Sequence, residues 1–160
     1  MNIFYLDDDL TLCAQYHNDK HVVKMILEYA QLLSTAHRTL DSVPDDSPLY
    51  KATHINHPCA VWVRKGDLHY AWLYLLFMAT CDEYTFRYGK IHKTDANLRN
   101  PLRLLPENIP HISVFEEPPQ AVTPECKIPG NAIQAYRNYY MKEKRHIASW
   151  KKRGPPEWWT

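Results

Sequence analysis

Hydrophobic residues recur every three or four positions along three stretches, the spacing that buries one face of an α-helix. The first covers residues 17–39, which contain no proline or glycine. The second covers residues 67–88, where Asp67 suits a helix start and Gly89 suits a helix end. The third begins at residue 131 and extends to about residue 152. The pattern therefore predicts three long helices.

Shorter elements are expected between these helices. The acidic run 7–9 opens a helical region, residues 58–65 continue helically after a proline, and residues 50–55 and 94–100 are each expected to form short helical turns. Residues 1–6 would form a strand or an extended arm. Seven of the twelve prolines lie between 101 and 129, which predicts a long connector. We expect an all-α, compact single domain of about five helices, with residues 1–160 as a single helical domain.

The composition supports a buried core, with 45% hydrophobic and 12% aromatic residues in a chain of 160. The four cysteines form no C-x-x-C pair, so we expect reduced thiols. Acidic residues interrupt any signal-peptide core, and the longest apolar run, 70–80, is too short to span a bilayer. These features predict a cytoplasmic protein with no membrane partner.

The net charge of +1 conceals an asymmetry along the chain. Residues 131–160 contain seven basic and two acidic residues, so they carry +5, whereas the remainder carries −4 (12 basic and 16 acidic). This favours an anionic partner for the C-terminal part. The aromatic residues interleaved there would suit base stacking, although their spacing equally suits a core. The predicted nucleic-acid contacts are Lys142, Lys144, Arg145, Lys151, Lys152 and Arg153.

The first long helix carries an unusual polar stripe. At 100° per residue, His17, His21, Lys24 and Glu28 fall within about 80° of one another, with Lys20 at the edge. One interpretation is an ordinary solvated face with a Lys24–Glu28 ion pair. The other is a site for acid–base chemistry or an activated lysine.

Two further groups could bind a ligand. The segment from His54 to Arg64 could shape a pocket or hold a metal, or its histidines could simply cap helix ends. Cations after the second long helix could contact phosphate or merely complement the helix dipole. The candidate ligand-binding residues are His54, Asn56, His57, Trp62, Arg64, Arg87 and Lys93.

These motifs together resemble a known family. The run 19–24 with Glu28, then Asn56-His57-Pro58 with Trp62, and finally a long helix ending in 83–84 and 87–89 resemble pyrimidine-dimer DNA glycosylases of the phage endonuclease V type. The likeness covers about residues 10–93. It implies an all-helical fold, removal of a damaged base, and strand cleavage by lyase chemistry on DNA, without a cofactor.

The resemblance also implies a mechanism in which an amine attacks the sugar C1′ and a carboxylate on the first helix assists. The family's amine belongs to a threonine exposed by loss of the initiator methionine. Here the chain begins Met1-Asn2, from which methionine is not expected to be removed. We therefore expect Lys24 or Lys20 to supply the amine, Glu28 the carboxylate, and His17 and His21 to carry protons or contact phosphate. Alternatives are a non-catalytic binder of nucleotides or nucleic acid, and a histidine-dependent metallohydrolase.

Overall fold

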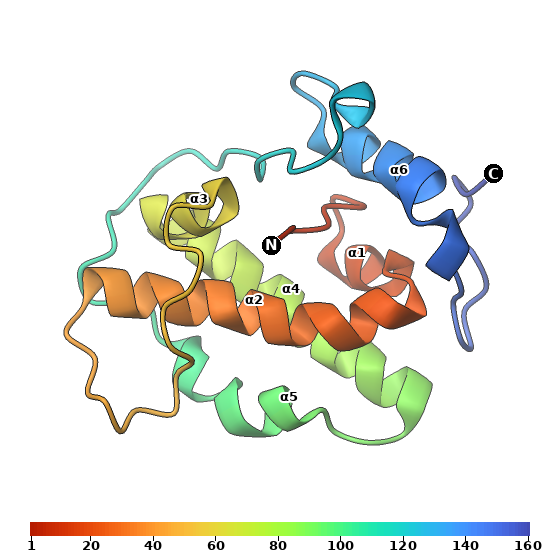
Figure 1. The fold of residues 1–160 in the computed structure, drawn as a ribbon. Coiled ribbons are helices and arrows are strands. Elements are labelled where there is room, and N and C mark those ends of the chain that lie inside the picture. Colours follow the sequence, from red (N-terminus) through yellow and green to blue (C-terminus); the bar gives the residue numbers. More distant parts are fainter.

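Six α-helices and three short 3₁₀ turns make up the fold, and no strand is present (Figure 1). The computed structural model describes all residues, 1–160. The α-helices are α1 (Leu10–Tyr16), α2 (Asp19–Leu40), α3 (Pro58–Lys65), α4 (Asp67–Tyr88), α5 (Lys93–Leu98) and α6 (Ala132–Glu143). The 3₁₀ turns are η1 (Pro101–Arg103), η2 (Pro124–Cys126) and η3 (Arg145–Ile147). The prediction of an all-α fold with a long connector is confirmed.

Helices α2 and α4 pack side by side and form the centre of the molecule, with α1, α3 and α5 around them (Figure 1). Both helices are 22 residues long, and α4 is apolar around most of its girth. It ends at Gly89, whose φ of 69° is in the left-handed region that glycine tolerates. The buried core runs continuously from the N-terminal arm to α6 and Trp150.

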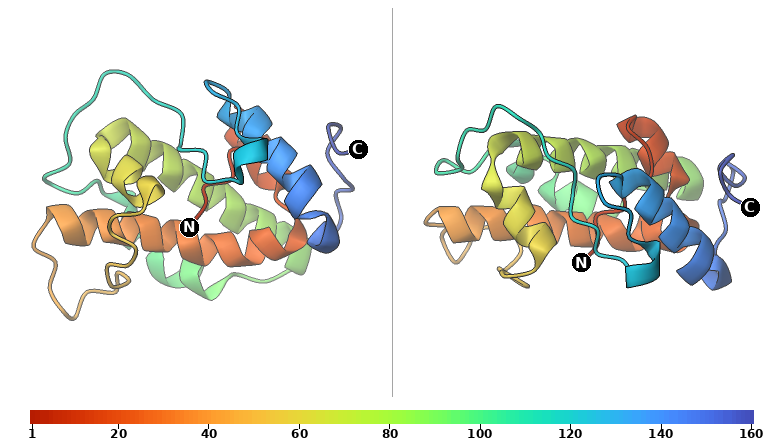
Figure 2. Two further views of the ribbon diagram at one scale, coloured as in Figure 1. Left: turned by 45° about the horizontal axis from the view of Figure 1, so that its top comes forward. Right: turned by 90° about the horizontal axis from the view of Figure 1, so that it is seen from above.

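Residues 1–6 form an extended arm, not a strand, and residues 3–6 are fully buried. The arm begins between α3 and α6 and lies against α2 in every view (Figures 1 and 2). The proline-rich connector passes around α3 and α4 before it reaches α6 (Figure 2). The start of the chain is therefore enclosed by segments that are distant from it in sequence.

Three predicted elements differ from the structure. Residues 50–55 form no helix, since their backbone polar groups bond to side chains of α2, as when the Tyr50 amide donates to Ser34. Helix α6 ends at Glu143 instead of residue 152, because Lys144 leaves the helical region and a 3₁₀ turn follows. The helix predicted for 17–39 begins at Asp19, because Asn18 caps it.

The four cysteines Cys13, Cys59, Cys81 and Cys126 are buried and unpaired, as the sequence predicted. Burial raises the pKa of Cys13 to about 12 and that of Cys59 to about 11, so both thiols stay protonated and unreactive at neutral pH. No helix combines the length and the apolar character needed to cross a membrane.

Candidate active site

The polar stripe predicted on the first helix is divided in two by Asn18. The Asn18 side chain accepts a hydrogen bond from the His21 amide and so starts α2, which leaves His17 outside that helix. Both histidines are buried, with exposed fractions of 0% and 4%. Only Lys20, Lys24 and Glu28 remain on the outer part of α2, and Lys20 and Lys24 are exposed.

Each buried histidine bonds to a tyrosine hydroxyl. His17 Nε2 is 2.7 Å from the hydroxyl of Tyr29, and His21 Nδ1 is 2.6 Å from that of Tyr140. Burial lowers the pKa of His17 to about 4 and that of His21 to about 3, so both rings are neutral at physiological pH. Both side chains are almost completely shielded from solvent, and their visible role is to hold the core together.

The centre of the remaining stripe is Glu28, whose side chain is 14% exposed. Its Oε1 is 3.8 Å from the amino nitrogen of Met1, and its Oε2 is 3.4 Å from Lys24 Nζ. Oε2 is buried and accepts no hydrogen bond. A carboxylate thus lies between two primary amines and retains an unused acceptor oxygen, an arrangement that the sequence pattern did not predict for Met1.

The arm that carries Met1 is fixed at several points. The Phe4 amide donates to the Tyr29 hydroxyl at 3.2 Å, and the Asn2 side chain donates to the carbonyl oxygen of Ala121 in the connector. The Cys13 thiol donates to the Phe4 carbonyl oxygen. These contacts position the first backbone nitrogen against α2. Because Tyr29 also bonds to His17, one buried histidine supports the arm indirectly.

A pocket of about 450 Å³ lies beside the arm. His57 connects the pocket to Met1. Burial is the main cause that lowers the pKa of the His57 imidazole, and the positive charge of the Met1 amino group lowers it further. Ala121, which binds Asn2, is also part of its wall. His57 Nδ1 accepts a hydrogen bond from the Cys59 amide at the start of α3. The pocket is lined by His57, Pro58, Pro119, Gln120, Ala121, Lys127 and Pro129.

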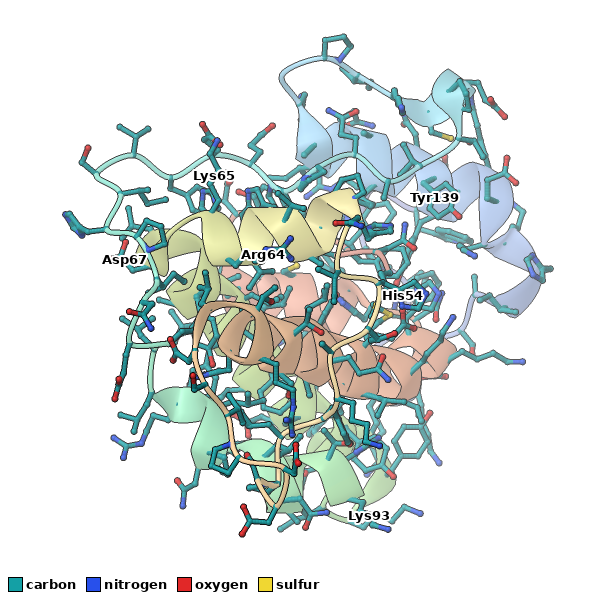
Figure 3. All side chains as sticks on the ribbon, turned by 60° about the vertical axis from the view of Figure 1, so that its left-hand side comes forward. His54, Arg64, Lys65, Asp67, Lys93 and Tyr139 are labelled. Carbon is teal, nitrogen blue, oxygen red and sulfur yellow. The ribbon has the colours of Figure 1, made fainter.

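The other predicted ligand-binding residues lie in several places. Trp62 is buried, stacks on His69 and donates to the carbonyl oxygen of Glu116. Arg64 donates to the carbonyl oxygen of Ile55, so it holds the loop that contains the exposed residues His54 and Asn56. Figure 3 shows His54 on the loop before α3.

Arg87 and Lys93 lie away from this group. Arg87 is buried and donates to Glu83, Asp19 and the carbonyl oxygens of Gln15 and His17, so it joins α4 to the α1–α2 junction. Lys93 is exposed at the start of α5, at the far end of the view in Figure 3. The predicted ligand set therefore does not meet in one pocket.

Most of the predicted C-terminal cations hold the tail to the helices. Arg153 pairs with Glu83, Lys152 donates to the Phe86 carbonyl oxygen, and Arg145 lies over Trp159. Lys151 lies over the ring of Tyr88. Lys142 is exposed, and Lys144 lies over the ring of Tyr139.

No three His, Cys, Asp or Glu side chains are arranged so that they could hold a metal ion. The Met1–Glu28–Lys24 group is suited to covalent catalysis. An unprotonated amine can attack an electrophilic carbon, while a carboxylate stabilises positive charge or accepts a proton. The pocket beside it provides an imidazole and an ammonium group for an anionic ligand.

Comparison with known proteins gives one family match. The family model described as pyrimidine dimer DNA glycosylase matches residues 1–97, which include Met1, Glu28 and His57. No curated protein and no solved structure shows significant similarity to the chain. The match covers more than half of the sequence, so the chain belongs to the family of pyrimidine dimer DNA glycosylases.

Proposed function

We propose that this protein removes damaged pyrimidines from DNA and then cleaves the strand as an abasic-site lyase, with the Met1 amino group as nucleophile and Glu28 as the assisting carboxylate. The observation that carries the proposal is the 3.8 Å separation of the Met1 nitrogen and Glu28 Oε1. Family membership supplies the substrate class, and this contact supplies an amine and a carboxylate at one place.

The reaction begins when the unprotonated amine bonds to C1′ of the damaged nucleotide. The bond from C1′ to the base breaks, and the base leaves with the electron pair and takes up a proton. The C1′–O4′ bond then opens, O4′ gains a proton, and nitrogen and carbon form an iminium ion. Loss of a C2′ proton expels the 3′ phosphate, and water finally releases the amine. Glu28 stabilises each cationic stage.

Two amines adjoin Glu28, and their surroundings favour Met1. An α-amino group is in general a weaker base than a lysine side chain, so more of it is unprotonated at neutral pH. Activation of a lysine usually requires burial, whereas the Lys24 side chain is 68% exposed. We therefore assign to Lys24 the role of holding the Glu28 carboxylate or a substrate phosphate. Lys20 lies one turn earlier on α2, and we assign to it a contact with phosphate. His17 and His21 position the arm and α6.

The test is borohydride trapping on duplex DNA that contains either a pyrimidine dimer or an abasic site. We expect a covalent adduct whose peptide map identifies the residue at the α-amine of Met1. Glu28→Gln should lower the single-turnover rate at least a hundredfold. An adduct on Lys24 would instead support the lysine mechanism. Absence of any adduct, with DNA binding intact, would favour the non-catalytic binder.

A matched pair of extended proteins isolates the amine. Two extra residues before Met1 should abolish trapping, because they remove the amine from Glu28, whereas the same two residues after Thr160 should leave it unchanged. Lys24→Gln should retain an adduct. If the N-terminally extended protein still formed the adduct at its normal rate, the Met1 assignment would be wrong.

A further inference from the structure

The C-terminal part of the chain, which the family model does not match, places an aromatic ring against the N-terminal arm. Tyr139 on α6 is half-buried and lies nearly parallel to Phe4, with ring centres 6.5 Å apart and planes 19° apart. Phe4 in turn stacks on His21 at 4.3 Å and 18°. Three rings from three separate segments therefore form one column, with Tyr139 at its outer end.

Cations surround the outer end of this column. The Lys144 ammonium lies over the Tyr139 ring, 5.3 Å from its centre. Lys144, which directly follows α6, and Lys24 on α2 both act electrostatically on the His21 ring. Lys24 is also the residue that contacts Glu28. Phe4 is three residues from Met1 and His21 is on the same helix as Glu28, so the ring column adjoins both segments that carry the proposed amine and carboxylate.

The distances suit a stretch of nucleic-acid strand. His21 precedes Glu28 by seven residues, which is about 10 Å along a helix axis and so roughly three stacked base steps. Figure 3 shows Tyr139 on α6 on the same side of the view as His54, whereas Lys93 lies at the opposite end. An aromatic face next to an ammonium group is the combination that holds an unstacked base and its phosphate.

We infer that Tyr139 and Lys144 form a strand-binding subsite, in which the Lys144 ammonium moves off the Tyr139 ring to a phosphate and one base of the DNA strand, a few nucleotides from the reacting sugar, takes its place on that ring. This inference rests on the proposed function for its substrate. It assigns to α6 a role in DNA binding that is separate from the amine chemistry. The base is recognised by its flat face, so the subsite does not select sequence.

The experiment measures binding without turnover. A Glu28→Gln background and a single-stranded oligonucleotide with a reduced abasic site are used, with 2-aminopurine placed one to five nucleotides to either side. We expect quenching of 2-aminopurine at one or two adjacent positions only. Tyr139→Leu, which keeps the apolar contact with Phe4 but has no π-face, should abolish that quenching and weaken binding about tenfold. Tyr139→Phe should bind within about twofold of the parent.

Lys144→Gln should reduce the slope of the binding constant against salt concentration by the amount that about one phosphate contact contributes. Lys90 is exposed on the segment after α4, and Lys90→Gln should leave this slope unchanged. Thermal unfolding of each variant confirms that the fold is intact. Equal affinity and equal quenching for Tyr139→Leu and Tyr139→Phe would overturn the subsite. The trapping assay fails independently if the amine chemistry is wrong, so the two proposals are separable.

Discussion

His17 and His21 are buried without charge, which makes the stability of the protein depend on pH. The pKa of each ring is about 4 and about 3 in the folded state, below the ordinary value near 6.5. Below pH 6.5 the unfolded chain therefore binds more protons than the folded one, and stability falls as the pH falls. The loss begins near pH 6.5 and continues until the folded-state pKa values are reached.

We expect the melting temperature to decrease between pH 6.5 and 4.5, before most carboxylates titrate. Replacing both rings, with His17→Gln and His21→Gln, should flatten this decrease even though it lowers stability at pH 7. His146→Gln is the control, because that side chain is exposed. The measurement is thermal unfolding followed by circular dichroism, and an unchanged pH slope in the double variant would contradict the assignment.

Arg87 provides a second prediction at the scale of single residues. Its guanidinium is fully buried and makes ion pairs with Glu83 and Asp19. Removing it leaves Glu83 buried with only Arg153 as a partner. We expect Arg87→Met to reduce the free energy of unfolding by about 3–5 kcal/mol, and Arg87→Lys to restore little of it, because an ammonium cannot reach the same four acceptors. Urea unfolding measures both, and a loss below about 1 kcal/mol would refute the structural role.

At the scale of elements, the N-terminal arm depends on α2 for its position. The Tyr29 hydroxyl accepts the Phe4 amide and bonds to His17, so Tyr29→Phe leaves both of these partners unsatisfied. We expect a stability loss of about 1–3 kcal/mol and slower borohydride trapping, because the amine is no longer held against Glu28. Tyr74→Phe, which removes a bond to the carbonyl oxygen of Arg99, is the matched control. It should lose stability without any change in trapping rate.

Helical periodicity was sufficient to predict α2 and α4 but not the break between α1 and α2. No proline or glycine lies between residues 10 and 40, and the two helices are separated by the non-helical backbone of His17 and by Asn18, which caps α2. Because of that break, the His17 side chain points into the core, and Glu28 remains as the centre of the site. The local pattern contained Glu28 and Lys24, but their relation to Met1 depends on a contact between segments 27 residues apart. The resemblance named an α-amine as nucleophile and was the one available signal for Met1.

At the scale of the whole molecule, the part outside the family match contributes to the core. Tyr136, Tyr140 and Trp150 are buried in the same cluster as the N-terminal arm, and Arg137 donates to the carbonyl oxygen of Leu6 and pairs with Asp7. The sequence prediction of one domain over residues 1–160 can be tested on this basis. We expect the full chain to unfold in one cooperative transition.

A fragment of residues 1–97 should not fold, although it contains every residue matched by the family model. Circular dichroism and heteronuclear NMR on the fragment measure this directly. A well-dispersed spectrum from the fragment would show that residues 98–160 form a dispensable addition. In that case the full chain should also unfold in two steps.

The enclosure of the N-terminal arm has a consequence for biosynthesis. Met1 leaves the ribosome well before Ala121, which holds Asn2, and before α6. At roughly 5–20 residues per second, the arm waits several seconds for these partners. The nascent chain therefore cannot complete the proposed site until α6 has left the ribosome, and newly made protein would gain its reactivity toward DNA only when that helix has docked.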